Sequence, residues 1–144
     1  MRTLAALALL FSAQAFACPN LTGSYTCTYQ DNSKEMITVS QDTKGTVTVY
    51  NINGSEMPAD GQTYAVPDSD NLKQGNFKAW CDGDTTLKGL LTGKYYNGGE
   101  YYGDLTMNMD WSLSGSDLKQ VSNGEVKNTG GTYPINQDTV CTKN

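Results

Sequence analysis

The segment YYGDLTMNMDWSLS, residues 101–114, decides the fold, because apolar and polar side chains alternate along most of it. A strand points successive side chains to opposite faces, so a period of two gives one apolar and one polar face. The apolar face carries Tyr101, Leu105, Met107, Met109, Trp111 and Leu113, and the polar face carries Asp104, Thr106, Asn108, Asp110 and Ser112. This pattern is typical of an antiparallel sheet with one buried face.

The same alternation extends outward from this segment, over residues 23–30, 37–39, 47–49, 77–81 and 87–91. Turns rich in glycine and asparagine separate these runs, and both residues tolerate a positive φ. The sequence therefore predicts an all-β, antiparallel up-and-down meander of about eight strands, with looser stretches at 55–74 and 122–131. Such a sheet hides its apolar face in a barrel or a sandwich, and short sequential hairpins favour the barrel.

The turn Asn97-Gly98-Gly99 allows the register of one hairpin to be predicted. The apolar faces on both sides fall on odd numbers, so the numbers of paired residues should sum to an even value. A three-residue loop satisfies this condition. It would pair Tyr95 with Tyr101, Leu91 with Leu105, and Leu87 with Met109.

This register predicts which tyrosines of the hairpin are exposed. Tyr95 and Tyr101 would face the core, whereas Tyr96 and Tyr102 would point outward beside the turn. Exposed aromatic side chains beside a loop tip suit contact with a carbohydrate or a protein. The simpler interpretation is that tyrosine is a good strand former.

The first residues predict an export signal. Arg2 supplies a positive charge, an apolar run follows from Leu4 to Phe11, and Ala15-Phe16-Ala17 gives the small-x-small pattern that signal peptidase cleaves. We therefore expect residues 1–17 to be a signal peptide and residues 18–144 to be one disulfide-stapled domain, secreted or periplasmic. No segment reaches the ~20 apolar residues that a membrane-spanning helix needs. A lipoprotein signal, which would attach lipid to Cys18, stays open as an alternative.

The composition of residues 18–144 excludes several classes of function. Without Arg2, the ten basic residues become nine lysines against fifteen acidic residues, a net charge of −6, and no arginine or histidine remains. Such a chain does not suit nucleic acid, and it lacks the base of histidine-dependent hydrolases and the histidine ligands of many zinc sites. The acidic loops at 68–71 and 82–84 do not complete a calcium-binding pattern. We therefore expect no enzymatic activity, no metal and no cofactor.

Four cysteines, Cys18, Cys27, Cys81 and Cys141, predict two disulfides in an exported chain. Three pairings are possible. The pairing of Cys18 with Cys27 is the least favoured, because an extended segment would hold them too far apart.

Six short segments resemble, in chain order, motifs of the avidin and streptavidin family, a branch of the eight-stranded calycin barrels. They are Leu21-Thr22-Gly23-Ser24-Tyr25, residues 33–37, 45–50 and 75–80, Trp111-Ser112-Leu113-Ser114-Gly115, and Asp138-Thr139-Val140. Cys27 replaces an asparagine of the family, and the distance from Gly98 to Trp111 is longer than in the family. The resemblance therefore implies a closed calycin-like barrel more strongly than it implies biotin as the ligand.

The resemblance also implies a ligand pocket. Ser33 and Tyr50 would donate hydroxyl hydrogen bonds, Asp138 would accept hydrogen bonds from ligand N–H groups, and Trp80 and Trp111 would form apolar walls. Each residue also has a plainer interpretation. Ser33 and Asp138 would be turn residues, Trp111 would be core packing, and Trp80 would face outward.

Closure of such a barrel places the first strand beside the last. Cys27 would then reach Cys141, and Cys18 would pair with Cys81. We therefore expect a secreted, non-enzymatic β-barrel that binds a small ligand, biotin-like or other. The alternative is an interaction or inhibitor module that contacts an envelope protein or glycan through an acidic outer face and through Tyr96 and Tyr102.

Overall fold

The computed structural model describes residues 17–144, all of them in strands, turns and loops. The predicted signal peptide lies outside the described residues, apart from residue 17. The ten strands are β1 (Gly23–Thr28), β2 (Lys34–Lys44), β3 (Val47–Ile52), β4 (Ser55–Pro58), β5 (Tyr64–Val66), β6 (Leu72–Asp82), β7 (Thr86–Asn97), β8 (Glu100–Ser114), β9 (Asp117–Asn128) and β10 (Gly131–Lys143). Among these residues no helix is long and apolar enough to cross a membrane.

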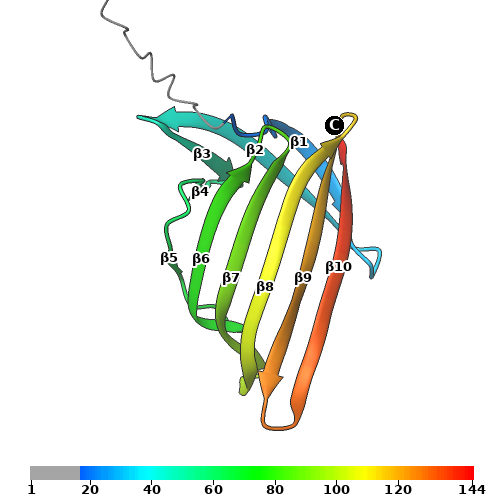
Figure 1. Ribbon diagram of the computed structural model, residues 1–144. Coiled ribbons are helices and arrows are strands. Elements are labelled where there is room, and N and C mark those ends of the chain that lie inside the picture. The colour runs from blue at the N-terminus through cyan, green and yellow to red at the C-terminus, as the bar shows by residue number, and fades with distance from the viewer. Residues whose placement is uncertain (1–16) are drawn as a thin grey trace, which may run out of the picture.

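The strands form one antiparallel sheet in the order β4-β3-β2-β1-β10-β9-β8-β7-β6-β5, which confirms the all-β meander. The sheet curls like half a barrel (Figure 1). The expectation of about eight strands in a closed barrel is wrong. The stretch 55–74 contains two short additional strands, β4 and β5, and these are the two edges of the sheet. They do not pair with each other, and residues 59–63 connect them.

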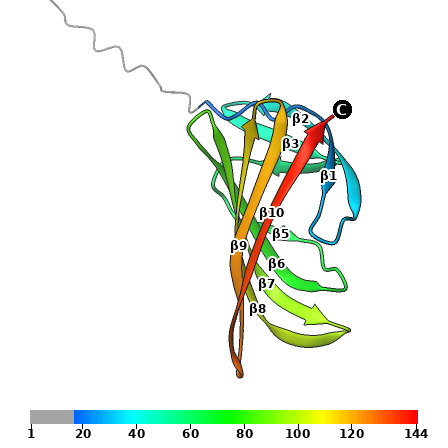
Figure 2. The same ribbon diagram turned by 90° about the vertical axis from the view of Figure 1, so that its right-hand side faces the viewer.

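A single backbone contact partly bridges this open seam. Asp60 forms an isolated antiparallel bridge with Trp80 of β6, and the Gly61 N–H donates to the Ala79 carbonyl at 2.7 Å. The molecule is therefore barrel-like at one end and an open, curved sheet at the other (Figure 2).

The β7–β8 hairpin corrects the predicted register. Asn97 pairs with Glu100, so the turn has two residues, Gly98 and Gly99, at φ values of 61° and 86°. A register shift follows immediately, and beyond it Tyr95 pairs with Gly103, Leu91 with Met107, and Leu87 with Trp111. In these β7–β8 pairs beyond the shift, the two residue numbers sum to an even value, as expected. The extra residue sits in a β-bulge within β8 instead of in the turn, and therefore every predicted pair is displaced by two residues.

The hydrophobic core lies at the barrel-like end. There, β1–β4 lie over the concave face of the long strands β6–β10 (Figures 1 and 2). The buried cluster comprises Leu21, Tyr25, Cys27, Val39, Tyr50, Ala79, Leu87, Met109, Trp111, Leu118 and Cys141. Burying one such large apolar side chain stabilises the fold by about 1.5–3 kcal/mol.

Both disulfides lie at this end as well, and we therefore call it the stapled end. Cys27 pairs with Cys141 across the neighbouring strands β1 and β10, and Cys18 pairs with Cys81 of β6, as expected. Two buried tyrosines hold the segment that precedes β1. The Tyr25 hydroxyl donates to the Leu21 carbonyl at 2.9 Å, and the Tyr50 hydroxyl donates to the Pro19 carbonyl at 2.6 Å.

Glycines allow the long strands to curve. A Cβ on Gly124 of β9 would meet the backbone of Thr106 and Met107 on β8, and a Cβ on Gly103 would meet the Lys127 carbonyl. Any side chain at these two positions would push neighbouring strands apart. The glycines therefore mark the bend between the stapled end and the opposite end of the sheet.

Candidate functional site

A cavity of about 230 Å³ lies at the stapled end, between β2–β3 and β7–β9. Its walls are mainly apolar and aromatic. The lining residues are Leu21, Tyr29, Glu35, Ile37, Val39, Tyr50, Ile52, Asn53, Leu87, Trp111, Leu118 and Gln120.

Two of the predicted pocket residues, Tyr50 and Trp111, meet in this cavity. Phe77 packs edge-on against Trp111, with ring centroids 6.4 Å apart and an interplanar angle of 71°. Gly89 provides the space for this pair, because a Cβ there would lie 2.8 Å from Phe77 and 2.9 Å from Trp111. The Trp111 ring is therefore fixed as a rigid wall.

Tyr50 contributes its ring rather than its hydroxyl. The hydroxyl is buried and donates to the Pro19 carbonyl. Burial disfavours the phenolate and raises the pKa of Tyr50 to about 12. The sequence-based role of a hydroxyl that donates to a ligand is therefore not the arrangement found here.

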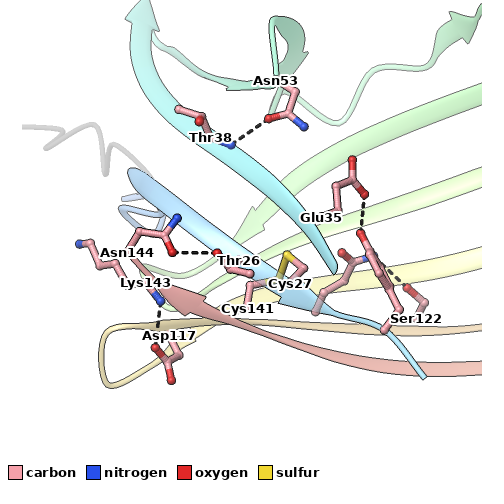
Figure 3. The surroundings of a disulfide bond; sticks show 12 residues. Thr26, Cys27, Glu35, Thr38, Asn53, Asp117, Ser122, Cys141, Lys143 and Asn144 are labelled. Atoms are coloured by element: carbon pink, nitrogen blue, oxygen red, sulfur yellow. Dashed lines mark hydrogen bonds between the residues drawn. A yellow bond between two sulfur atoms is a disulfide. The ribbon is translucent and has the colours of Figure 1, made fainter. Parts of the chain in front are cut away.

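The rim of the cavity is polar and is formed by Tyr29, Glu35, Asn53 and Gln120. The Tyr29 hydroxyl donates to Glu35 Oε2 at 2.8 Å, and Gln120 Nε2 donates to Ser122 Oγ at 3.3 Å. Glu35 lies on β2 beside the Cys27–Cys141 disulfide (Figure 3). Partial burial, together with the bond and charge of Glu35, raises the pKa of Tyr29, so the hydroxyl stays protonated.

The other three predicted pocket residues lie outside the cavity. Ser33 is exposed in the β1–β2 turn, where its N–H donates to Asp31 Oδ1 at 2.9 Å. Trp80 alternates with the concave-facing Ala79 and Cys81 and is half-buried, with Lys78 Nζ 5.4 Å from the ring centroid. Asp138 is exposed on β10. The five residues therefore do not converge on one ligand.

A second hollow of about 580 Å³ lies at the open seam between β4 and β5. Met57 and Pro58 line one side, Tyr64 and Val66 line the other, and Ile52 lines both this hollow and the cavity. The seam hollow is mostly apolar. Ile52 thus lies between the cavity and the seam hollow.

Five tyrosines gather at the opposite end of the sheet, which we call the tip: Tyr95, Tyr96, Tyr101, Tyr102 and Tyr133. The β-bulge corrects their predicted placement. Tyr101 is not a core residue, because 49% of it is exposed and its ring packs edge-on against Tyr96. Tyr102 is exposed at 38%, but it packs against Tyr95 and Tyr133 instead of pointing to the face opposite Tyr95.

The outer face of β7 and β8 carries charges of both signs. Lys88 lies 3.5 Å from Asp82 and 3.9 Å from Asp110, and Lys94 lies 3.5 Å from Asp104. The expected acidic outer face is thus partly neutralised along these strands. Within residues 17–144, no group of three or more histidine, cysteine or acidic side chains could hold a metal ion.

Sequence reasoning missed the rim residues Glu35 and Gln120 and the tip residue Tyr133. The sequence contained a signal for the first two. Glu35 falls on the same strand face as Ile37 and Val39, and Gln120 falls on the same face as Leu118. A polar residue at an apolar position of a strand indicates a site or a cavity. Tyr133 carried no local signal, because its contact with Tyr102 depends on how β8 and β10 are placed.

No protein-family model, no curated protein and no solved structure matches the chain. The candidate sites therefore rest on the geometry of the stapled end and of the tip.

Proposed function

We propose that this protein is a non-enzymatic, secreted or periplasmic binding protein for a small ligand, held in the cavity of the stapled end. The observation that supports the proposal is the cavity itself, about 230 Å³ with Trp111 and Tyr50 in its walls. An apolar cavity of about 150 Å³ already accommodates benzene. The ligand body is therefore a single ring or a short branched chain, and its apolar surface provides most of the binding free energy.

The rim favours a ligand head group that donates hydrogen bonds. The Glu35 carboxylate is an acceptor, and Gln120 Oε1 is a second acceptor, since the bond from Nε2 to Ser122 Oγ orients the amide. Asn53 Oδ1 already accepts from the Thr38 N–H at 2.8 Å. Since carboxylate–ammonium hydrogen bonds are stronger than neutral ones, a primary amine is the head group that fits best.

The rim disfavours biotin. The carboxylate of biotin would lie near Glu35, and Ser33 and Asp138, which the family resemblance assigned to the ligand, lie elsewhere. Like charges at close range oppose binding. The proposal therefore keeps a small ligand and replaces biotin by an apolar amine.

The two disulfides support the proposed location. Structural disulfides persist in secreted and periplasmic compartments and are rare where thiols are kept reduced. The net charge of −6 over residues 18–144 also raises the local concentration of cationic ligands around the protein.

A thermal unfolding assay with three compounds tests this proposal. Phenethylamine and phenylacetate have the same ring and similar length but opposite charge, and biotin is the third compound. A ligand that binds only the folded state stabilises it by about 2.7 kcal/mol at a hundredfold excess over Kd. We expect stabilisation by phenethylamine, and little by phenylacetate or biotin.

A matched pair of variants locates the site. Ile37→Phe adds side-chain volume inside the cavity, whereas Met36→Phe changes the next residue on the opposite face, where Met36 is 68% exposed. We expect Ile37→Phe to abolish stabilisation by phenethylamine and Met36→Phe to retain it. Equal stabilisation of both variants by phenethylamine would reject the cavity as the site. So would the absence of stabilisation of the parent protein and both variants by all three compounds.

A further inference from the structure

We propose that the tip carries a second binding site, separate from the cavity, that takes a neutral oligosaccharide. The site is an open groove of about 820 Å³ between the β7–β8 and β9–β10 hairpins. Its lining combines three tyrosine rings with charged, amide and hydroxyl groups: Tyr101, Tyr102, Asp104, Lys127, Asn128, Thr129, Gly130 and Tyr133.

Tyrosine rings from three strands form an aromatic strip, of which Tyr102 and Tyr133 line the groove and Tyr95 packs against Tyr102. Tyr95 of β7 and Tyr102 of β8 have ring centroids 6.0 Å apart, and Tyr102 and Tyr133 of β10 have centroids 5.6 Å apart. Tyr102 is exposed at 38% and Tyr133 at 41%. The strip therefore offers ring surface to a ligand without further rearrangement.

The groove opens because the two hairpins diverge. Asp104 and Lys127 are the last paired residues of β8 and β9 toward the tip, and the bulge in β8 follows. Asn128 braces the gap, since its Nδ2 donates to the Tyr102 carbonyl at 2.8 Å and its Oδ1 accepts from the Gly130 N–H at 2.7 Å. A braced groove loses little conformational entropy when a ligand binds.

Asp104 supplies a fixed acceptor at the edge of the groove. The Tyr101 hydroxyl donates to its Oδ1 at 2.8 Å, and Lys94 Nζ lies 3.5 Å away. The Tyr101 hydrogen bond, followed by the charge of Lys94, holds the pKa of Asp104 below its usual value. The carboxylate thus stays ionised and can accept hydrogen bonds from sugar hydroxyls.

The chemistry of the groove favours a neutral sugar over the other ligands. Lys127 forms an ion pair with Glu125 at 2.6 Å, and Lys94 forms one with Asp104. The groove therefore offers a polyanion no cationic patch of unpaired lysines. The groove is open to solvent, which suits a ligand that stays partly hydrated when bound. A sugar presents both C–H surface, which packs on aromatic rings, and hydroxyls, which stay hydrated.

Titration of the ¹⁵N-labelled oxidised protein with cellohexaose, chitohexaose and maltohexaose, followed by NMR, tests this proposal. We expect at least one hexasaccharide to shift the amide signals of residues 101–104 and 127–133 without shifting those of the cavity. Tyr102→Ala and Tyr133→Ala should each weaken that binding roughly tenfold, equivalent to about 1.4 kcal/mol.

Tyr64→Ala is the matched control, because Tyr64 is exposed at 41%, the same as Tyr133, but lies at the seam. It should leave hexasaccharide binding unchanged. Trp111→Phe, a change in the cavity wall, should also leave it unchanged, so failure of this site and failure of the cavity proposal are distinguishable. The absence of shifts with all three sugars, or shifts that survive both tip variants, would overturn the proposal.

Discussion

The stapled end and the tip use the same residue, tyrosine, in opposite ways. At the stapled end Tyr25 and Tyr50 are completely buried, and each hydroxyl donates to a backbone carbonyl of the segment before β1. At the tip the rings of Tyr102 and Tyr133 are exposed and contact other tyrosine rings. The difference arises because β1–β4 cover the concave face at one end only (Figure 1).

This comparison separates stability from binding. The buried tyrosines, the core and both disulfides belong to one half of the sheet, so substitutions there should lower the free energy of unfolding. Substitutions at the tip should change binding and leave stability nearly unaffected. The cavity is the exception, because it belongs to the stable half and is also a candidate site.

The largest effect should come from the disulfide between β1 and β10. Its two cysteines are 114 residues apart, and loop-closure entropy assigns about 4–5 kcal/mol to a loop of this size. We expect Cys27→Ala combined with Cys141→Ala to lower the free energy of unfolding by about this amount in urea titrations. A loss below about 1 kcal/mol would mean that the stapled end does not depend on its staple.

The next effect is a loss of stability at alkaline pH. The pKa of Tyr50 is about 12 in the folded protein and 10.0 in the unfolded chain. Between pH 10 and pH 12 the folded chain therefore keeps a proton that the unfolded chain loses. The contribution of Tyr50 to stability should therefore be constant below pH 10 and fall by an amount on the order of 2 kcal/mol as the pH rises to about 12.

Tyr50→Phe isolates this contribution. The variant starts less stable by about 1 kcal/mol, because the Pro19 carbonyl loses its donor. Its stability should then decline less steeply than that of the parent above pH 10, as followed by urea unfolding at several pH values. Parallel declines of parent and variant would show that Tyr50 does not contribute to the alkaline loss.

The smallest effect is expected at the tip. Tyr102→Ala removes an exposed ring, and surface substitutions usually change stability by no more than about 0.5 kcal/mol. The urea midpoint should therefore stay close to that of the parent. A loss of about 2 kcal/mol or more would show that the aromatic strip stabilises the sheet, and the contrast between the two ends would fail.

Local patterns in the sequence were sufficient for the architecture of the long strands. The alternation along residues 105–113 placed Met109 and Trp111 correctly on the concave face. It could not place the β-bulge, because a glycine at Gly99 is compatible with a two-residue or a three-residue turn. The short edge strands β4 and β5 also escaped prediction, since three or four residues are too few to show a period.

The candidate sites were less predictable than the fold. Tyr50 and Trp111 were identified, but Ser33, Trp80 and Asp138 were grouped with them only through the family resemblance. The rim and the tip are formed by strands far apart in the chain, such as β2 with β9 and β8 with β10. Their meeting depends on how the sheet curls, which local periodicity does not encode.

Tryptophan fluorescence tests the central claim, that a small apolar amine occupies the cavity, most directly. The chain has two tryptophans, and only Trp111 lines the cavity, so a Trp80→Phe protein reports from the cavity wall alone. We predict that phenethylamine changes the Trp111 emission saturably, and that adding Ile37→Phe removes the change whereas adding Met36→Phe preserves it. An unchanged Trp111 emission, or a change that survives Ile37→Phe, would contradict the proposed site.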